Sequence, residues 1–290
     1  MKTAKLRFLA SMAIFGTVGI FVRMIPMSST AIAFFRGAVG LLFLLGVMAL
    51  TKKQPAYADI RKNAGLLLLS GAAMGFNWIL LFEAYRYTTV ATATVCYYLA
   101  PAFVVLASPL LGEKLTAKKL VCAAIALVGL VCVSGVISVR EQTGMDFLGV
   151  VMGVGAAVLY ATVVLLNKKL PPMGAYDKTT VQLGAASLVI LPYMLLTEGV
   201  PQLPTDPLGM ICLATVCVVH TGFAYAMYFG AMSHVNAQTV AIFSYLDPVI
   251  AILLSALLLR EPMDAFGVIG SVLILGSALY SEMPHKAKKG

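Results

Sequence analysis

The sequence predicts an all-α integral membrane protein: ten transmembrane helices, arranged as two inverted five-helix repeats around a central cavity, with both termini cytoplasmic. An apolar composition, apolar runs of membrane-spanning length and related segments in the two halves predict this fold. Of 290 residues, 60% are hydrophobic and 11% are charged, and the mean hydropathy is +0.94. Soluble domains carry roughly a quarter charged residues and cannot hide this much apolar surface. The lipid bilayer is therefore the expected solvent.

Ten apolar runs define the predicted helices, and most have about the 20 residues needed to cross ~30 Å of hydrocarbon. The predicted ranges are 6–23, 30–50, 64–84, 88–111, 117–138, 146–167, 179–197, 208–232, 236–259 and 264–282. The first run has the basic start of a signal peptide. Arg23 interrupts it, however, and a related run recurs in the second half. We therefore interpret it as a transmembrane helix.

The distribution of cations predicts the orientation. With the N-terminus inside, sixteen of the 21 lysines and arginines fall in cytoplasmic segments. Four fall in outer segments, namely Arg23, Arg86, Arg140 and Arg260, and Arg36 lies within a helix. This asymmetry follows the positive-inside rule. It predicts an even number of crossings in a plasma membrane, taken to be a bacterial cytoplasmic membrane.

The chain contains an internal repeat. Residues 82–108 and 229–255 share eight identities at a constant offset, including Tyr98/Tyr245, Leu99/Leu246 and Pro101/Pro248. The start of each half also corresponds, as AIFGTVGIFVR and VLYATVVLLNK. Five helices per copy make the second copy enter the membrane from the opposite side, which is the pattern of secondary transporters. We assign the repeats to 1–140 and 141–290.

Several function classes lack their motifs. The sequence has no GxxxxGK[ST] phosphate loop, no GxSxG nucleophile elbow and no His/Cys/carboxylate cluster with metal spacing. Its five cysteines form no CxxC pair, so apolar packing is the expected role. Aromatic residues are not interleaved with the cations, as nucleic-acid binding would require. We expect no enzymatic activity, cofactor, metal or nucleic-acid partner.

Each half combines a proline-bearing fourth helix, a glutamate after it and a glycine-bearing fifth helix. The residues concerned are Leu99-Ala100-Pro101 with Gly112-Glu113-Lys114-Leu115, Leu246-Asp247-Pro248 with Arg260-Glu261-Pro262, and Phe35-Arg36. In this the chain resembles the EamA-type branch of the drug/metabolite transporter superfamily, over essentially its whole length. The resemblance implies a cavity among helices 1–4 and 6–9, with helices 5 and 10 peripheral. Arg260 departs from Gly112 of the first half.

Asp247 is an acidic residue deep within an apolar run. Pro248 and Pro101 lack an N–H, so each leaves a carbonyl without its helical partner, and in a membrane such a break belongs beside a wet cavity. We therefore interpret Asp247 as a cavity residue that binds a cationic group or carries a proton. The alternative is a structural carboxyl group paired with a neighbouring helix.

Arg36 is the second charge within the membrane. It is a candidate ligand for a substrate carboxylate, and the alternative is a side chain that reaches the outer interface. With Asp247 it would suit a zwitterion. Further candidate substrate-binding residues are Asn77, Trp78, Tyr97, Tyr98, His220, Tyr225, Ser244 and Tyr245. His220 is alternatively a neutral side chain bonded between helices, and the aromatic residues are alternatively packing. Glu113 and Glu261 are interpreted as gate or helix-end residues.

These observations predict a secondary active or facilitative transporter that exports a small metabolite by alternating access. An amino acid or similar amphipathic solute is the favoured substrate class, and protons are a candidate coupling ion. One alternative is an exporter of cationic drugs or quaternary amines; another is an intramembrane enzyme or scaffold. The expected partners are the solute and the lipid bilayer, and the chain is expected to be a monomer or weak homodimer.

Overall fold

The computed structural model describes residues 2–111, 116–133, 144–171, 173–232, 243, 246–261 and 263–283. In these ranges the ordered elements are helices, and no strand occurs. The first half contains α1 (Lys2–Gly16), α2 (Val18–Arg23), α3 (Ser29–Leu50), α4 (Tyr57–Lys62), α5 (Ala64–Tyr87), α6 (Val90–Tyr97), α7 (Ala100–Ala107), η1 (Ser108–Leu111) and α8 (Ala117–Val133). The second contains α9 (Gly144–Lys169), α10 (Ala175–Thr197), α11 (Pro207–Ala214), η2 (Thr215–Phe223), α12 (Ala224–Met232), α14 (Leu246–Leu258) and α15 (Ala265–Glu282).

Seven helical segments of the described chain are long and apolar enough to cross a membrane. They are Thr3–Arg23, Ser29–Leu50, Ala64–Tyr87, Val90–Ala107, Asp146–Lys169, Ala175–Thr197 and Pro207–Tyr228. The predicted runs 117–138, 236–259 and 264–282 correspond to the shorter helices α8, α14 and α15. Large apolar side chains such as Leu42, Leu188 and Leu257 are exposed on the outer faces of the bundle. A surface of this kind suits lipid better than water.

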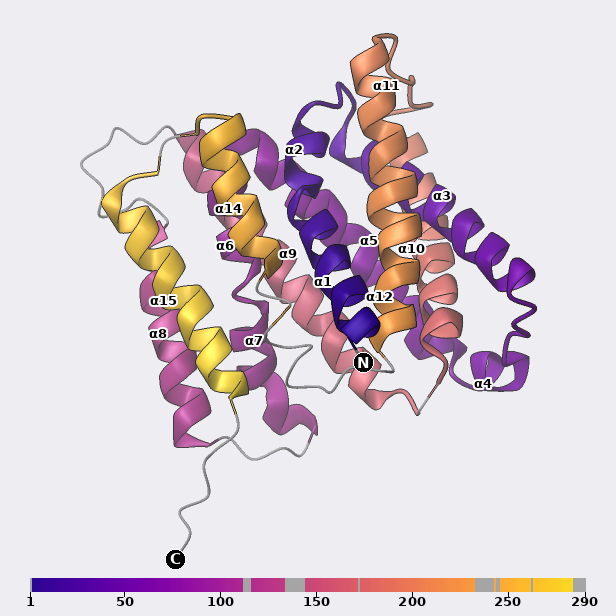
Figure 1. Ribbon diagram of the computed structural model, residues 1–290, viewed down its shortest axis with the longest axis horizontal. Helices are drawn as coiled ribbons and strands as arrows, with labels where there is room; N and C mark the ends of the chain where they lie inside the picture. The colour runs from indigo at the N-terminus through magenta and orange to yellow at the C-terminus, as the bar shows by residue number, and fades with distance from the viewer. Residues whose placement is uncertain are drawn as a thin grey trace, which may run out of the picture.

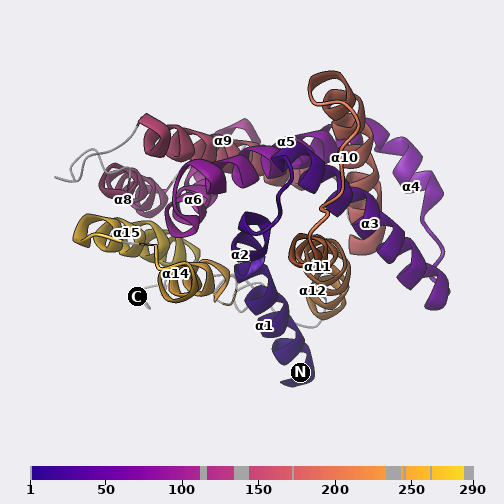
Figure 2. The same cartoon turned by 90° about the horizontal axis from the view of Figure 1, so that it is seen from above.

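The helices form one bundle, with different helices at its two edges (Figures 1 and 2). Helices α8 and α15 pack together at one edge, while α3, α4 and α10 lie towards the opposite edge. Helix α1 lies between them, against α12 and α14. We call the end where α2 and α5 finish the Arg23 end, and the end where α9 finishes and α10 begins the Lys178 end. Helix α1 begins and α15 finishes towards the Lys178 end (Figure 1).

Three segments depart from continuous α-helix, and all three adjoin functional candidates. The first predicted helix divides at Thr17, between α1 and α2. The fourth divides at Tyr98 and Leu99, just before Pro101, as a proline without an N–H predicts. The eighth contains the π-helix η2, in which Thr221 Oγ1 donates to the carbonyl of Val216 at 3.0 Å. π-helical turns are frequent at functional sites.

Small residues bring neighbouring helices close together. A Cβ placed on Gly71 of α5 would lie 2.6 Å from the carbonyl oxygen of Gln182 on α10. A Cβ on Gly16 would lie 2.6 Å from the carbonyl oxygen of Asp247. Real Cβ atoms do not approach backbone this closely, so glycine is what permits both contacts. The Gly16 contact holds the break in the first helix directly against the start of α14.

Candidate functional site

A cavity of about 560 Å³ lies among helices from both halves of the chain. This volume is within the ~300–1,000 Å³ typical of small-molecule sites. Of the predicted residues, Arg36, Asn77, Trp78, Tyr97, Tyr98, Pro101, Tyr225 and Asp247 line it. The described lining of this cavity does not include His220, Pro248 or Glu261. Glu113, Ser244 and Tyr245 lie outside the described residues.

Asp247 lies in the first turn of α14. The hydroxyl of Tyr98, at the break between α6 and α7, donates a hydrogen bond of 3.0 Å to Asp247 Oδ2. No lysine or arginine pairs with Asp247 among the described residues. A carboxylate at such depth is costly unless it is paired or faces a cavity. Asp247 is therefore a cavity-lining carboxyl group whose one described hydrogen-bond partner comes from the other half of the chain.

Arg36 lies on α3 and is only 6% exposed, so the predicted alternative in which it reaches the interface is wrong. Its Nε donates to Thr221 Oγ1 at 2.9 Å. Its guanidinium carbon lies 4.5 Å from the ring centroid of Trp78 and 5.6 Å from that of Phe82, which are cation–π distances. In the described part of the chain, Arg36 has no carboxylate partner. Among the described residues it is a buried cation held by a neutral hydroxyl and aromatic rings, without a salt bridge.

Asn77 is a second polar residue whose bonding is incomplete. Its Nδ2 donates to the carbonyl of Ala156 on α9 at 2.5 Å, and this contact fixes which way the amide points. Its Oδ1 is buried and has no hydrogen-bond partner among the described residues. Buried acceptors without a partner are rare in native proteins. The residue was predicted as a hydrogen-bonding candidate, and the structure places it on the cavity wall.

Aromatic rings form much of the remaining wall. Phe15 meets Tyr225 edge-on at 5.4 Å between centroids, and Tyr97 lies 5.3 Å from Tyr160. Tyr98 meets Tyr97 edge-on at 6.1 Å. Such rings pack with one another and still present apolar surface to a ligand. Trp78 forms part of this wall and also makes the cation–π contact with Arg36.

A polar cluster at the Lys178 end was not predicted from the sequence. Gln182 Nε2 donates to Ser70 Oγ and to Asn167 Oδ1, each at 2.7 Å. Gln182 and Asn167 line the cavity with Lys178 and Thr179. Lys178 is one of the basic residues that predict the orientation, and Asn167 adjoins others. For this reason neither residue was predicted to line the cavity. The cluster extends the cavity to the junction of α9 and α10.

His220 was predicted as a substrate-binding candidate, with a bonded interhelical residue as the alternative. Its Nε2 lies 2.7 Å from Thr17 Oγ1, and its Nδ1 lies 3.1 Å from the carbonyl oxygen of Thr215. Its ring also packs against Phe21 at 5.1 Å. The described geometry matches the interhelical alternative: His220 joins η2 to the break at Thr17.

Glu261 and Pro248 lie away from the cavity lining. Glu261 pairs with Arg23 at 2.5 Å at the Arg23 end. Pro248 is buried in the first turn of α14, next to Asp247. A second ion pair, between Glu83 and Arg86, also lies at the Arg23 end, with 3.4 Å between the charged atoms.

Several curated relatives carry transporter names. The chain is 28% identical to "Uncharacterized transporter YxxF" of Bacillus subtilis, covering 96% of this chain and 89% of that protein. It is 26% identical to "Uncharacterized inner membrane transporter YhbE" of Escherichia coli, covering 90% and 84%. It is 30% identical to "Protein PecM" of Dickeya dadantii, covering 74% and 72%.

The fold also has a counterpart among solved structures. One crystal structure superposes with a TM-score of 0.62 and covers 97% of this chain and 96% of that chain, at 17% identity. The EamA-like transporter family model matches residues 3–135 and again residues 147–282, so that nearly the whole chain is covered by two copies. A multi-pass helical membrane protein with transporter relatives is what these findings describe. The chain belongs to the EamA-like transporter family.

Proposed function

We propose that this protein exports a small zwitterionic solute, of which an amino acid is the simplest example. Arg36 would bind the carboxylate of the solute, and Asp247 would bind its ammonium group. The aromatic wall would take the apolar part. The solute would cross as the two halves exchange conformations, driven by its own gradient or by protons.

One observation carries this proposal: two opposite charges line the same cavity, and neither has a described counter-ion. Each is held instead by a neutral side chain, Thr221 for Arg36 and Tyr98 for Asp247. A buried charge without a partner costs several kcal/mol by order of magnitude. Two such charges facing one cavity are explained if a ligand completes both pairs.

The membrane arrangement in this proposal is ten crossings in two inverted halves, with both termini in the cytoplasm. The paired family matches support a repeated unit, and the distribution of cations supports the orientation. In this arrangement the Lys178 end is cytoplasmic and the Arg23 end is external. The cavity then reaches the cytoplasmic end through Asn167 and Lys178, as expected of a transporter that collects its solute inside.

The test is flux through purified protein in liposomes, with an amino acid, its decarboxylated amine and its deaminated acid as three radiolabelled solutes. The Arg36→Ala variant should lose flux of the amino acid and acid but keep flux of the amine. The Asp247→Asn variant should lose flux of the amino acid and amine but keep flux of the acid. Arg61→Ala, which removes an exposed arginine of α4 that lines neither described cavity, serves as the matched control.

Two results would overturn the proposal. One is an unsubstituted protein that moves no amino acid under any gradient of solute or protons. The other is an Arg36→Ala variant that moves amino acids as well as the unsubstituted protein does. If that variant moves only amines, and Asp247→Asn abolishes their flux, the cation-exporter alternative is correct.

A further inference from the structure

A second cavity, of about 520 Å³, lies at the Arg23 end. It is lined by Arg23, Arg86 and the connection between α2 and α3. One residue, Tyr85 of α5, lines both this cavity and the central one. The two spaces are therefore neighbours with a shared wall.

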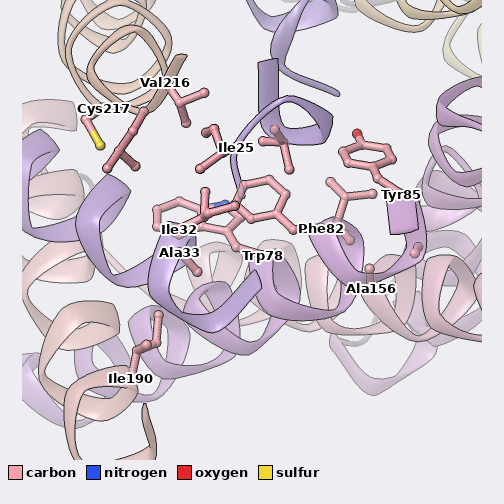
Figure 3. Packing of buried hydrophobic residues seen from close by; sticks show 14 of the residues in the cluster. Ile25, Ile32, Ala33, Trp78, Phe82, Tyr85, Ala156, Ile190, Val216 and Cys217 are labelled. Atoms are coloured by element: carbon pink, nitrogen blue, oxygen red, sulfur yellow. The ribbon is translucent and has the colours of Figure 1, made fainter. Parts of the chain in front are cut away.

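The shared wall is a thin layer of side chains. Phe82 is fully buried and Tyr85 is 3% exposed, and their rings stack with 6.4 Å between centroids. Figure 3 shows Trp78, Phe82 and Tyr85 along α5, with Ile25 and Ile32 packed beside them. Of these three α5 residues, Trp78 lines only the central cavity and Phe82 lines only the second. Passage from one cavity to the other requires the layer of Phe82 and Tyr85 to move.

A polar latch lies beside this layer. The carboxylate of Glu261, just after α14, pairs with Arg23 at the end of α2. It also accepts hydrogen bonds from the Ser255 hydroxyl and, at 2.8 Å, from the Val90 N–H at the start of α6. One side chain of the second half thus holds two elements of the first. Arg23 adds a 3.0 Å bond to the carbonyl of Thr88.

Helix α2 connects the contacts of Glu261 to the layer of Phe82 and Tyr85. Gly19 of α2 lies against both Val90 and Tyr85: a Cβ placed on it would be 2.5 Å from Val90 Cγ1 and 3.3 Å from the Tyr85 ring. The Tyr85 hydroxyl in turn lies 3.4 Å from Thr94 Oγ1 on α6. By holding α2 and α6 together, Glu261 keeps two of the helices that contact Tyr85 in place.

We propose that Phe82 and Tyr85 form the outer gate of the transport path, that the Glu261–Arg23 latch keeps it closed, and that the second cavity is the vestibule into which the solute is released. This rests on the transport function proposed above. The structure is then the state open to the cytoplasm. Opening the gate requires Glu261 to release α2 and α6, after which Tyr85 is free to move.

The test measures access to the central cavity from outside, independently of transport. Val163, which lines that cavity, is changed to cysteine in a full-length chain whose native cysteines are replaced by alanine. A membrane-impermeant maleimide is then applied to intact cells. Glu261→Gln and Tyr85→Ala should each raise the labelling rate about tenfold or more, because each loses contacts made only in the closed state. Inside-out vesicles should label without either change.

Glu198→Gln is the matched control, because Glu198 is a glutamate at the same end that accepts a hydrogen bond from Ser28 outside the gate. It should leave labelling unchanged. If Tyr85→Ala does not fold, Glu261→Gln and Arg23→Gln carry the test. Unchanged labelling in the folded variants would overturn the gate, as would an equal rise in Glu198→Gln. If the proposed transport function is wrong, the liposome assay will show no flux. The labelling experiment does not depend on flux, so its result still tests the gate.

Discussion

Tyr98 of the first half donates its hydroxyl hydrogen bond to Asp247 of the second, at 3.0 Å and across 149 positions of sequence. Tyr98 lies at the break before Pro101, and Asp247 directly precedes Pro248, the corresponding proline of the second half. The bond therefore joins the two proline-bearing regions at the wall of the central cavity.

The Tyr98→Phe change should lower stability, because it removes the described donor to the half-buried carboxylate of Asp247. Hydrogen bonds to charged groups contribute about 1.5–3 kcal/mol, and the melting temperature should fall accordingly. In an Asp247→Asn background the same change should cost less, and the difference is the coupling energy. Tyr97→Phe is the control, since the Tyr97 hydroxyl lines the cavity without a described hydrogen bond. Equal effects in both backgrounds would show that the bond contributes nothing.

Arg36→Lys should weaken solute binding despite keeping the charge. Lysine cannot present the planar group that bonds Thr221 while lying over Trp78. We expect the dissociation constant for an amino acid to rise about tenfold, the equivalent of ~1.4 kcal/mol. Isothermal titration in detergent measures it, with Arg61→Lys on the exposed surface of α4 as the control. An unchanged constant would mean that Arg36 acts only through its charge.

Much of the helical pattern could be predicted because apolar length alone determines it. The run 30–50 became α3 at Ser29–Leu50. Helix α10 begins at Ala175, before the predicted start at residue 179. The prediction started too late because the first turns carry polar residues, some of which line the cavity, and these residues do not belong to an apolar run. The break before Pro101 was predicted from the missing N–H. The π-helix was not, because it arises from how Thr215–Phe223 packs between α3 and α2, and no local residue preference encodes that.

Site residues could be predicted from the sequence where a charged residue lies within an apolar run. Arg36 and Asp247 stand out because charges in apolar runs are costly. Gln182 and Asn167 gave a weaker signal, because uncharged polar residues near helix ends are ordinary. His220 gave an ambiguous signal: its chemistry suits either substrate binding or a bond between helices, and its contacts with Thr17 and Thr215 depend on tertiary packing.

Thr17→Val should therefore lower stability and leave solute affinity unchanged. It leaves the buried His220 Nε2 without its partner, which costs about 1–3 kcal/mol, and Thr17 is not part of the described cavity lining. Thr162→Val is the control, because Thr162 bonds only the carbonyl of Val158 in its own helix. Melting temperature and amino-acid titration give the two readouts. Lost affinity at unchanged stability would support a substrate-binding role for His220.

Gly71→Ala should lower stability by about 1–3 kcal/mol, the usual cost of forcing an extra carbon into a packed interface. The new Cβ would lie 2.6 Å from the Gln182 carbonyl and from the Ala185 side chain, so α5 and α10 must separate. Gly46→Ala in α3 meets nothing within 4 Å. It should be neutral or stabilising by up to about 1 kcal/mol, because alanine favours helix. Melting temperatures of the two variants compare them directly. If Gly71→Ala melts no lower than Gly46→Ala, the α5–α10 contact is looser than the structure shows, and Gln182 is then not held against Ser70 by this interface.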